Sequence, residues 1–258
     1  MSEKATKKTE DNPTAVERPQ QQKRIIWVTG SKGGTGKSTF ARGLLDVLLK
    51  HGVDVAAFDG DPDNSQLYRF YKDVGGGVTR VAITERDGGD ELLLTMEEGE
   101  AAVILVDTPA GAREVLANLE DEFGLLSALP ELGYRMTMVS LLSRVKDSVN
   151  QLKYAFNEMA DYDVAHVVVK NLFYGDKDKF RIFDRAKVQQ QIKDAGGAVI
   201  QMRDLFEDTY ELLDDHDLAF QQATAVSDVV LPPDVRRVNQ WRKHFEAQVR
   251  LTNGLLGL

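Results

Sequence analysis

A polyphosphate-binding pattern stands near the start of the chain, in Lys32-Gly33-Gly34-Thr35-Gly36-Lys37-Ser38-Thr39. Its glycines let successive backbone N–H groups point at one anion without obstruction from side chains. A helix that begins just after them would add the partial positive charge of its N-terminus. Lys37 would reach the β- and γ-phosphates, and the Ser38 hydroxyl would complete the coordination of Mg²⁺. The pattern therefore predicts a phosphate site formed by Gly33, Gly34, Thr35, Gly36, Lys37, Ser38 and Thr39.

Carboxylates follow two later apolar runs. Asp107 comes directly after Val103–Val106, and an acid after a buried strand fits a Walker B aspartate that holds Mg²⁺ through water. Asp59 and Asp61 lie in Phe58-Asp59-Gly60-Asp61-Pro62-Asp63-Asn64. Their alternate spacing directs both toward the same side if the preceding strand persists that far. For Asp63 and Asn64 we favour ordinary turn chemistry.

The elements around the glycine-rich stretch are those that a phosphate-binding loop requires. Ile25–Thr29 is apolar and predicts a buried first strand, and the apolar spacing of Phe40–Leu49 predicts a helix. Strand, glycine-rich turn and helix in that order are the context in which such a loop works.

Strands and helices alternate along the rest of the chain. Further strands are expected at 53–58, 79–84, 102–106, 136–142, 164–169 and 198–202, and helices at 91–98, at 149–159 and from Asp234 onward. This alternation predicts an α/β fold, a doubly wound and mainly parallel sheet with helices on both faces. Residues 1–23 are polar, carry both signs of charge and predict a disordered tail, which leaves 24–258 as a single domain.

Composition excludes several kinds of protein. The chain has 258 residues and no cysteine, so disulfides, thiolate metal sites and cysteine-ligated iron–sulfur clusters are excluded. No apolar run is long enough for a transmembrane helix, and we expect a cytoplasmic protein. The net charge of −9 argues against a uniformly basic nucleic-acid binder. It leaves room for a local basic face, because charges act over a Debye length of about 8–10 Å.

The glycine-rich stretch departs from the standard G-x-x-x-x-G-K-[ST], since Ser31 replaces the first glycine and Lys32 follows it. In this respect the chain resembles the ParA/MinD family of deviant Walker A ATPases, whose pattern is K-G-G-x-x-K-[ST]. The resemblance implies an ATP- and Mg²⁺-dependent homodimer in which Lys32 reaches the nucleotide of the other subunit. It also implies that Asp59 supports the metal and that Asp61 orients the attacking water, so the catalytic residues would be Lys32, Lys37 and Asp61 and the metal-binding ones Ser38, Asp59 and Asp107.

Asn171 follows the apolar strand expected at 164–169. The family has an asparagine at this strand end that contacts the adenine, and the resemblance extends that role to Asn171. The competing interpretation is a loop asparagine with no ligand.

The resemblance, taken with features of this chain, narrows the function. Family members that carry clusters or zinc need cysteines, the tyrosine kinases need a tyrosine-rich tail, and membrane-bound members end in a basic amphipathic helix. This chain has no cysteine and no tyrosine-rich tail, and its final eight residues contain two glycines and no charge, so no membrane attachment is expected. What remains is the short ParA-like ATPase, slow and stimulated by a small DNA-binding or adaptor protein. In these proteins the ATP-bound dimer binds nonspecific DNA, at the nucleoid, and segregates or positions a cargo such as a plasmid.

A basic segment near the C-terminus would supply the contacts to DNA phosphates, through Arg236, Arg237, Arg242 and Lys243. They do not all share one helical face, so only some can serve. The alternative function is an ATP-dependent switch that docks a protein and does not bind DNA. It would use the stretch from Asp204 to Asp217, which has seven acids and no lysine or arginine. Solvated helix faces would account equally for both charge runs.

Overall fold

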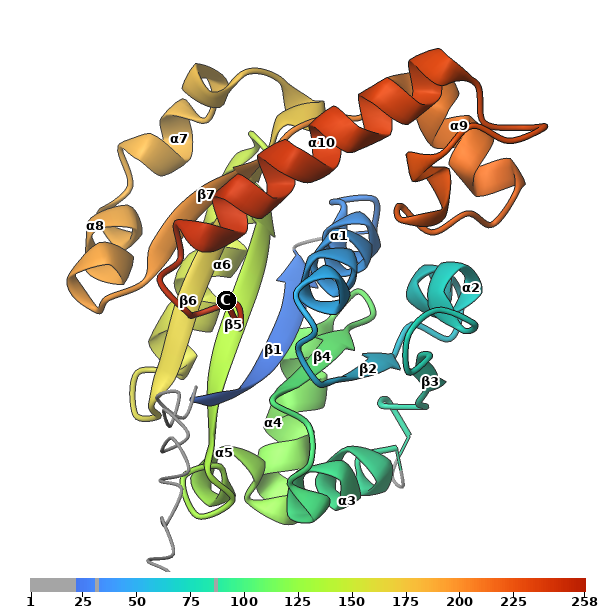
Figure 1. The fold of residues 1–258 in the computed structure, drawn as a ribbon. Coiled ribbons are helices and arrows are strands. Elements are labelled where there is room, and N and C mark those ends of the chain that lie inside the picture. Colours follow the sequence, from blue (N-terminus) through green and yellow to red (C-terminus); the bar gives the residue numbers. More distant parts are fainter. Residues whose placement is uncertain (1–21, 31–32, 86–87) are drawn as a thin grey trace, which may run out of the picture.

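A computed structural model describes residues 22–30, 33–85 and 88–258. Within these residues, seven strands form one sheet in the order β3-β2-β4-β1-β5-β6-β7, and every neighbouring pair is parallel (Figure 1). The strands are β1 (Lys23–Gly30), β2 (Val55–Asp59), β3 (Thr79–Arg80), β4 (Val103–Asp107), β5 (Tyr134–Leu142), β6 (Val164–Asn171) and β7 (Ala198–Met202). The predicted doubly wound α/β fold is confirmed.

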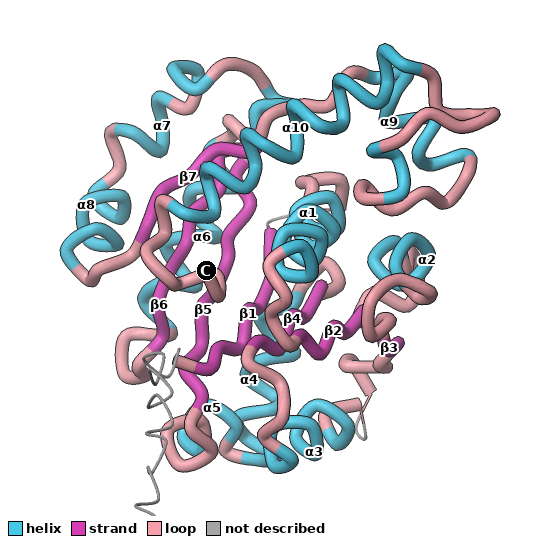
Figure 2. Tube along the Cα trace, in the orientation of Figure 1, coloured by secondary structure: helices cyan, strands magenta, loops and turns pink. Residues whose placement is uncertain are grey.

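Helices cover both faces of this sheet (Figure 2). One face carries α1 (Lys37–Lys50), α2 (Gln66–Tyr71), α9 (Glu207–Asp215) and α10 (Pro232–Arg250). The other carries α3 (Asp90–Glu98), α4 (Ala112–Phe123), α5 (Leu125–Ala128), α6 (Lys146–Glu158), α7 (Arg181–Asp184) and α8 (Lys187–Asp194). Short 3₁₀ turns are η1 (Leu172–Tyr174), η2 (Lys177–Lys179) and η3 (Gln222–Thr224). Along β1, Ile26 and Val28 face the first layer and Ile25 and Trp27 the second, as the two-residue period of a strand requires.

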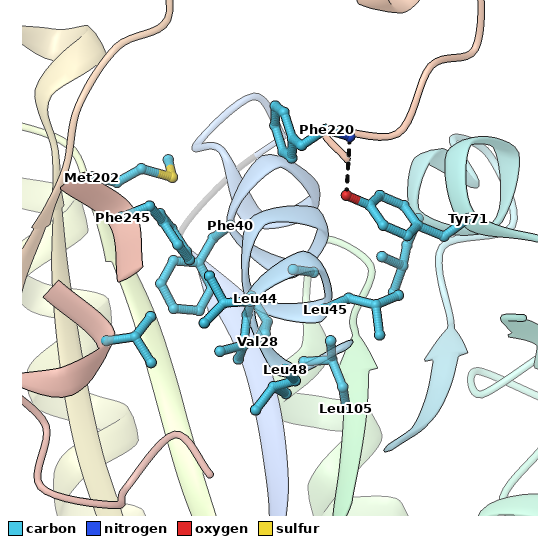
Figure 3. Close-up of a cluster of buried hydrophobic side chains, with 14 of the residues drawn as sticks. Val28, Phe40, Leu44, Leu45, Leu48, Tyr71, Leu105, Met202, Phe220 and Phe245 are labelled. Carbon is cyan, nitrogen blue, oxygen red and sulfur yellow. Dashed lines mark hydrogen bonds between the residues drawn. The ribbon is translucent and has the colours of Figure 1, made fainter. Parts of the chain in front are cut away.

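Helix α1 lies at the centre of the first layer (Figure 3). Phe40, Leu44 and Leu48 are fully buried, and the ring of Phe40 lies 5.3 Å from that of Phe245 in α10. Gly43 permits this close packing, since a Cβ there would lie 2.8 Å from the Trp241 ring. Each such large apolar side chain contributes roughly 1.5–3 kcal/mol on burial. The helix that follows the glycine-rich loop is therefore held rigidly against both the sheet and α10.

Most predicted elements are confirmed, with differences at the edges. The strand expected at 79–84 is wrong beyond Arg80, because the Glu85 N–H donates to the Ala82 carbonyl and the chain turns there. Helices α2, α4, α5, α7, α8 and α9 were not predicted. Of the tail expected at 1–23, residues 1–21 lie outside those that the structure describes, and Lys23 already belongs to β1.

A buried histidine in β6 makes the stability of the fold depend on pH. His166 is 4 % exposed, its ring lies 5.0 Å from that of Phe156, and burial lowers its pKa to about 4. In the unfolded chain this histidine binds a proton near pH 6.5, whereas in the folded chain it does so only near pH 4. As the pH falls from about 6.5 to 4, the free energy of unfolding should therefore decrease by up to about 3 kcal/mol. His166→Gln should flatten that part of the unfolding free-energy profile in urea titrations. The exposed control His216→Gln should not, and identical profiles for His166→Gln and wild type would refute the effect.

Candidate functional site

The glycine-rich loop joins β1 to α1 at the carboxyl end of the sheet. Gly34 and Gly36 have φ values of 75° and 91°, a backbone region that favours glycine. Helix α1 begins at Lys37, and the Phe40 N–H closes its first turn on the Gly36 carbonyl at 3.0 Å. Lys37 is 6 % exposed. Residues 33–36 therefore form a glycine turn at this strand end, and a helix begins directly after it. Lys32 lies outside the described residues.

Asn171, the last residue of β6, contacts this loop. Its Nδ2 donates to the Thr35 carbonyl at 2.9 Å, and its Oδ1 accepts from the Phe173 N–H at 3.1 Å. A Cβ on Gly36 would lie 2.5 Å from the same Nδ2, so this close approach also requires a glycine. Contact between Asn171 and an adenine stays a prediction, because here the amide bonds to the loop backbone.

Asp107 ends β4 in a fully buried position beside the loop. It pairs in register with Val28 of β1 and with Asp59 of β2. Burial raises its pKa to about 7, with the Asp59 charge adding to the rise, while the nearby Ser38 hydroxyl and the Lys37 ammonium oppose it. Within the described residues neither carboxylate oxygen accepts a well-aligned hydrogen bond. An unsatisfied buried carboxylate costs free energy, and a cation could relieve that cost.

Asp59 organises the loop that follows β2. Its two carboxylate oxygens accept from the backbone N–H groups of Asp61 at 3.1 Å and Tyr68 at 2.9 Å. Burial raises its pKa, and these two hydrogen bonds oppose the rise. The structure therefore gives Asp59 a part in anchoring the start of α2.

Asp61 lies beyond the end of β2, so the strand does not persist far enough to place it beside Asp59 by alternation. Its Oδ1 accepts from the N–H groups of Asp63 at 3.2 Å and Asn64 at 3.1 Å. The turn chemistry expected for these two neighbours is confirmed. The Asp61 side chain is partly exposed at the strand ends, on the same sheet edge as Asp107.

The donor set suits Mg²⁺ bound together with phosphates. No cluster of three histidine or acidic side chains that could hold a metal occurs within the described ranges. Mg²⁺ does not require one, because it keeps several waters and binds through one or two carboxylates and the substrate's phosphates. The buried Asp107 with its unsatisfied oxygens and the Ser38 hydroxyl next to it fit that pattern.

A cavity of about 470 Å³ opens beside the loop. Its walls include Thr39, Asn171, Phe173, Tyr210 and Trp241. The Thr39 and Tyr210 hydroxyls lie 3.3 Å apart, within hydrogen-bond reach. The volume and the aromatic lining suit a nucleoside. Sequence reasoning missed Phe173, Tyr210 and Trp241, because no motif marks them and α9 and α10 bring two of them from far along the chain.

The basic residues of α10 fall into two groups. Arg242 forms an ion pair with the buried Asp46 of α1 at 2.7 Å, and Arg237 pairs with Asp234 at 3.2 Å. Arg236 and Lys243 are exposed and lie seven residues apart, about two helical turns, on one face. Arg236 and Lys243 are therefore better placed than Arg237 and Arg242 to contact a binding partner.

In the described part of the chain, no helix is both long and apolar enough to cross a membrane.

Comparisons with known proteins agree with the fold and with a nucleotide-binding loop after β1. Residues 26–211 match the protein family described as the CobQ/CobB/MinD/ParA nucleotide binding domain. Protein MobD of Acidithiobacillus ferrooxidans is 25 % identical over 183 residues, covering 71 % of this chain and 78 % of that protein. MinD in the MinC:MinD cell division complex of Aquifex aeolicus gives a TM-score of 0.51 at 13 % identity, covering 90 % of this chain and 96 % of that one. A ParA family ATPase of Chlorobium tepidum TLS gives 0.51 at 12 % identity, covering 86 % and 99 %. These two structures support the fold.

Proposed function

We propose that this chain, which belongs to the CobQ/CobB/MinD/ParA family of nucleotide-binding domains, is a slow ATPase that dimerises on ATP and whose hydrolysis is stimulated by a partner protein. One observation carries the proposal. The buried ammonium of Lys37 and the hydroxyl of Ser38 both lie near the fully buried carboxylate of Asp107, at the end of the glycine-rich loop. A polyphosphate that carries a metal ion needs such an arrangement, in which a cationic side chain contacts the phosphates and a carboxylate contacts the metal ion.

Each residue has a distinct part in this mechanism. The loop N–H groups and Lys37 bind and neutralise the phosphates. Ser38 and Asp107 would hold Mg²⁺, which would neutralise charge that develops on the phosphate oxygens. Asp61 orients the attacking water from the partly exposed loop after β2. Lys32 acts on the nucleotide of the second subunit, which makes hydrolysis depend on dimerisation. In such an enzyme the slow rate of hydrolysis determines how long the dimer stays assembled and its partners stay bound.

We further propose that the ATP-bound dimer binds nonspecific DNA through α10, and so positions a cargo such as a plasmid with a small DNA-binding or adaptor partner. Arg236 and Lys243 are the exposed cations that support this footprint. A single subunit with a net charge of −9 should bind DNA weakly. Dimerisation doubles the number of phosphate contacts, so retention should require ATP.

Arg236→Glu with Lys243→Glu should abolish retention on nonspecific DNA at low salt while ATP affinity stays unchanged. Each phosphate contact contributes about −0.9 to the slope of log affinity against log salt concentration. Arg236→Glu alone or Lys243→Glu alone should therefore make this slope less steep by about 1 for each contact that is lost. Retention on a DNA column with MgATP, against MgADP, measures this. The matched control is Lys153→Glu with Lys193→Glu, which reverses two exposed cations on α6 and α8 with the same change in net charge. Equal loss in both double variants would refute the α10 footprint.

A protein-docking switch is the second candidate, and the surface around α9 favours it. Between Asp204 and Val235 there are nine acids and no lysine or arginine. The same segment exposes the apolar side chains Phe206, Val226, Val229 and Leu231. Three of the acids already pair with arginines, Asp214 and Asp217 with Arg69 and Asp234 with Arg237, and the others remain available to a basic protein segment. Exposed acids and apolar groups on one segment suit such a protein partner better than DNA. Absence of ATP-dependent DNA retention by the wild-type protein at low salt would favour this function over DNA binding.

A further inference from the structure

The segment that follows β6 holds two consecutive carbonyls of the phosphate-binding loop. The Tyr174 hydroxyl donates to the Gly34 carbonyl at 2.6 Å, and the Asn171 amide donates to the Thr35 carbonyl at 2.9 Å. Both side chains come from the strand end and the single turn of η1, 136 to 140 residues away in sequence from the loop that they contact. The loop is thus held from outside its own strand–turn–helix unit.

These two hydrogen bonds fix the direction of two loop N–H groups. In a trans peptide the C=O and the N–H of one plane point in opposite directions, and the described residues contain no cis peptide. When Tyr174 holds the Gly34 carbonyl, the Thr35 N–H of the same plane points away from Tyr174. By the same geometry Asn171 directs the Gly36 N–H. Consecutive N–H groups that are turned in this way form an anion-binding concavity.

Contacts within its own turn orient the partly exposed Tyr174. Its ring meets that of Phe173 edge to face, with the centroids 5.3 Å apart and an interplanar angle of 88°. The turn that carries it is closed by the Gly175 N–H on the Leu172 carbonyl at 3.0 Å, and its start is tied by the Phe173 N–H on Asn171. Burial raises the pKa of Tyr174, so the phenol keeps its proton and remains a donor.

We propose that Tyr174 is a positioning residue for the nucleotide phosphates, which pre-orients the loop amides through the Gly34 carbonyl. This rests on the proposed nucleotide site and adds to it a residue that no motif marks. Without the hydroxyl the Gly34–Thr35 peptide can rotate, and the cost of restoring its orientation falls on phosphate binding. A net hydrogen-bond contribution of typical size corresponds to an affinity loss of about 3- to 10-fold.

The test is Tyr174→Phe, which removes one oxygen and keeps the ring against Phe173. With Mg²⁺ present, ATP and inorganic pyrophosphate should each bind about 3- to 10-fold more weakly, by the same factor. Adenosine, measured by competition, should bind as it does to the wild-type protein. A purely structural role would lower the melting temperature without separating phosphate ligands from the nucleoside.

Tyr134→Phe is the matched control. Tyr134 also donates its hydroxyl to a backbone carbonyl, that of Ala101 at 2.7 Å, but at the amino end of β5, far from the loop. It should lower stability and leave affinity for ATP and pyrophosphate unchanged. Wild-type pyrophosphate affinity in Tyr174→Phe, or an equal loss in both variants, would overturn the role of Tyr174 alone. A wild-type protein that binds neither ATP nor pyrophosphate would refute the nucleotide site itself.

Discussion

Lys37→Ala should bind MgATP at least about 100-fold more weakly than the wild-type protein. Its ammonium is almost fully buried at the first position of α1, where solvent screening is weak and a charge-assisted contact to a phosphate is strong. Loss of that contact leaves the phosphates partly uncompensated. Titration calorimetry with ATP and Mg²⁺ measures the affinity directly.

A control on the same helix separates this effect from a general loss of stability. Lys50 is the last residue of α1, exposed and paired with Glu246 at 2.6 Å. Lys50→Ala should keep wild-type affinity for ATP even if its melting temperature falls. Wild-type ATP affinity in Lys37→Ala would remove the basis for the phosphate site.

Asp61→Ala should bind ATP, release phosphate roughly 10²- to 10⁴-fold more slowly, and accumulate as an ATP-bound dimer. The reason is that the attacking water loses the group that orients it, while the phosphate contacts stay intact. Lys32→Ala should also bind ATP and lose hydrolysis, because its proposed target lies on the other subunit. Sedimentation with ATP, combined with a phosphate-release assay, measures both quantities.

Asp63→Ala is the control for this pair, because Asp63 is an exposed acid of the same turn whose backbone N–H, not its carboxylate, bonds to Asp61. It should keep wild-type turnover. A monomeric Asp61→Ala protein with normal turnover would contradict the proposed water-orienting role.

The order of the central strands was predictable because each contains an apolar run, such as Val103–Val106 in β4 and Val167–Val169 in β6. Strands such as β4 and β6 are buried on both faces, so their sequences identify them without any tertiary information. Several helices were not predicted, among them the 12-residue α4, and β3 was predicted too long, since it ends at Arg80. Helices α5 and α7 have only four residues each. Tertiary contacts rather than local pattern determine such pieces.

The site was predictable where it is local in sequence and not where distant segments meet. Asp107 is the last residue of an apolar strand, and Lys37 and Ser38 begin the helix that follows another, so topology alone brings them to the carboxyl end of the sheet. The hydrogen bond from Tyr174 to the loop depends on packing between segments that no motif connects. The same holds for the aromatic side chains of α9 and α10 that line the cavity beside the loop.

The basic residues of α10 were visible in the sequence, but which of them are free to bind a partner was not. Its charges could be counted from the sequence, but the partner of each could not. Helix packing pairs Arg242 with Asp46 of α1, which becomes evident only once α1 and α10 are seen side by side (Figure 1). Arg237 is exposed but pairs with Asp234, so Arg236 and Lys243 are the better candidates for DNA contact, and their role stays a prediction.

Phosphate release from MgATP by the purified protein tests the central claim most directly. We predict slow, Mg²⁺-dependent turnover whose rate per subunit rises with protein concentration as dimers form, and which Lys37→Ala and Asp107→Asn both abolish. Chelation of Mg²⁺ should stop it reversibly. Turnover that persists in Lys37→Ala, or a wild-type protein that neither binds nor hydrolyses ATP at any concentration, would contradict the claim.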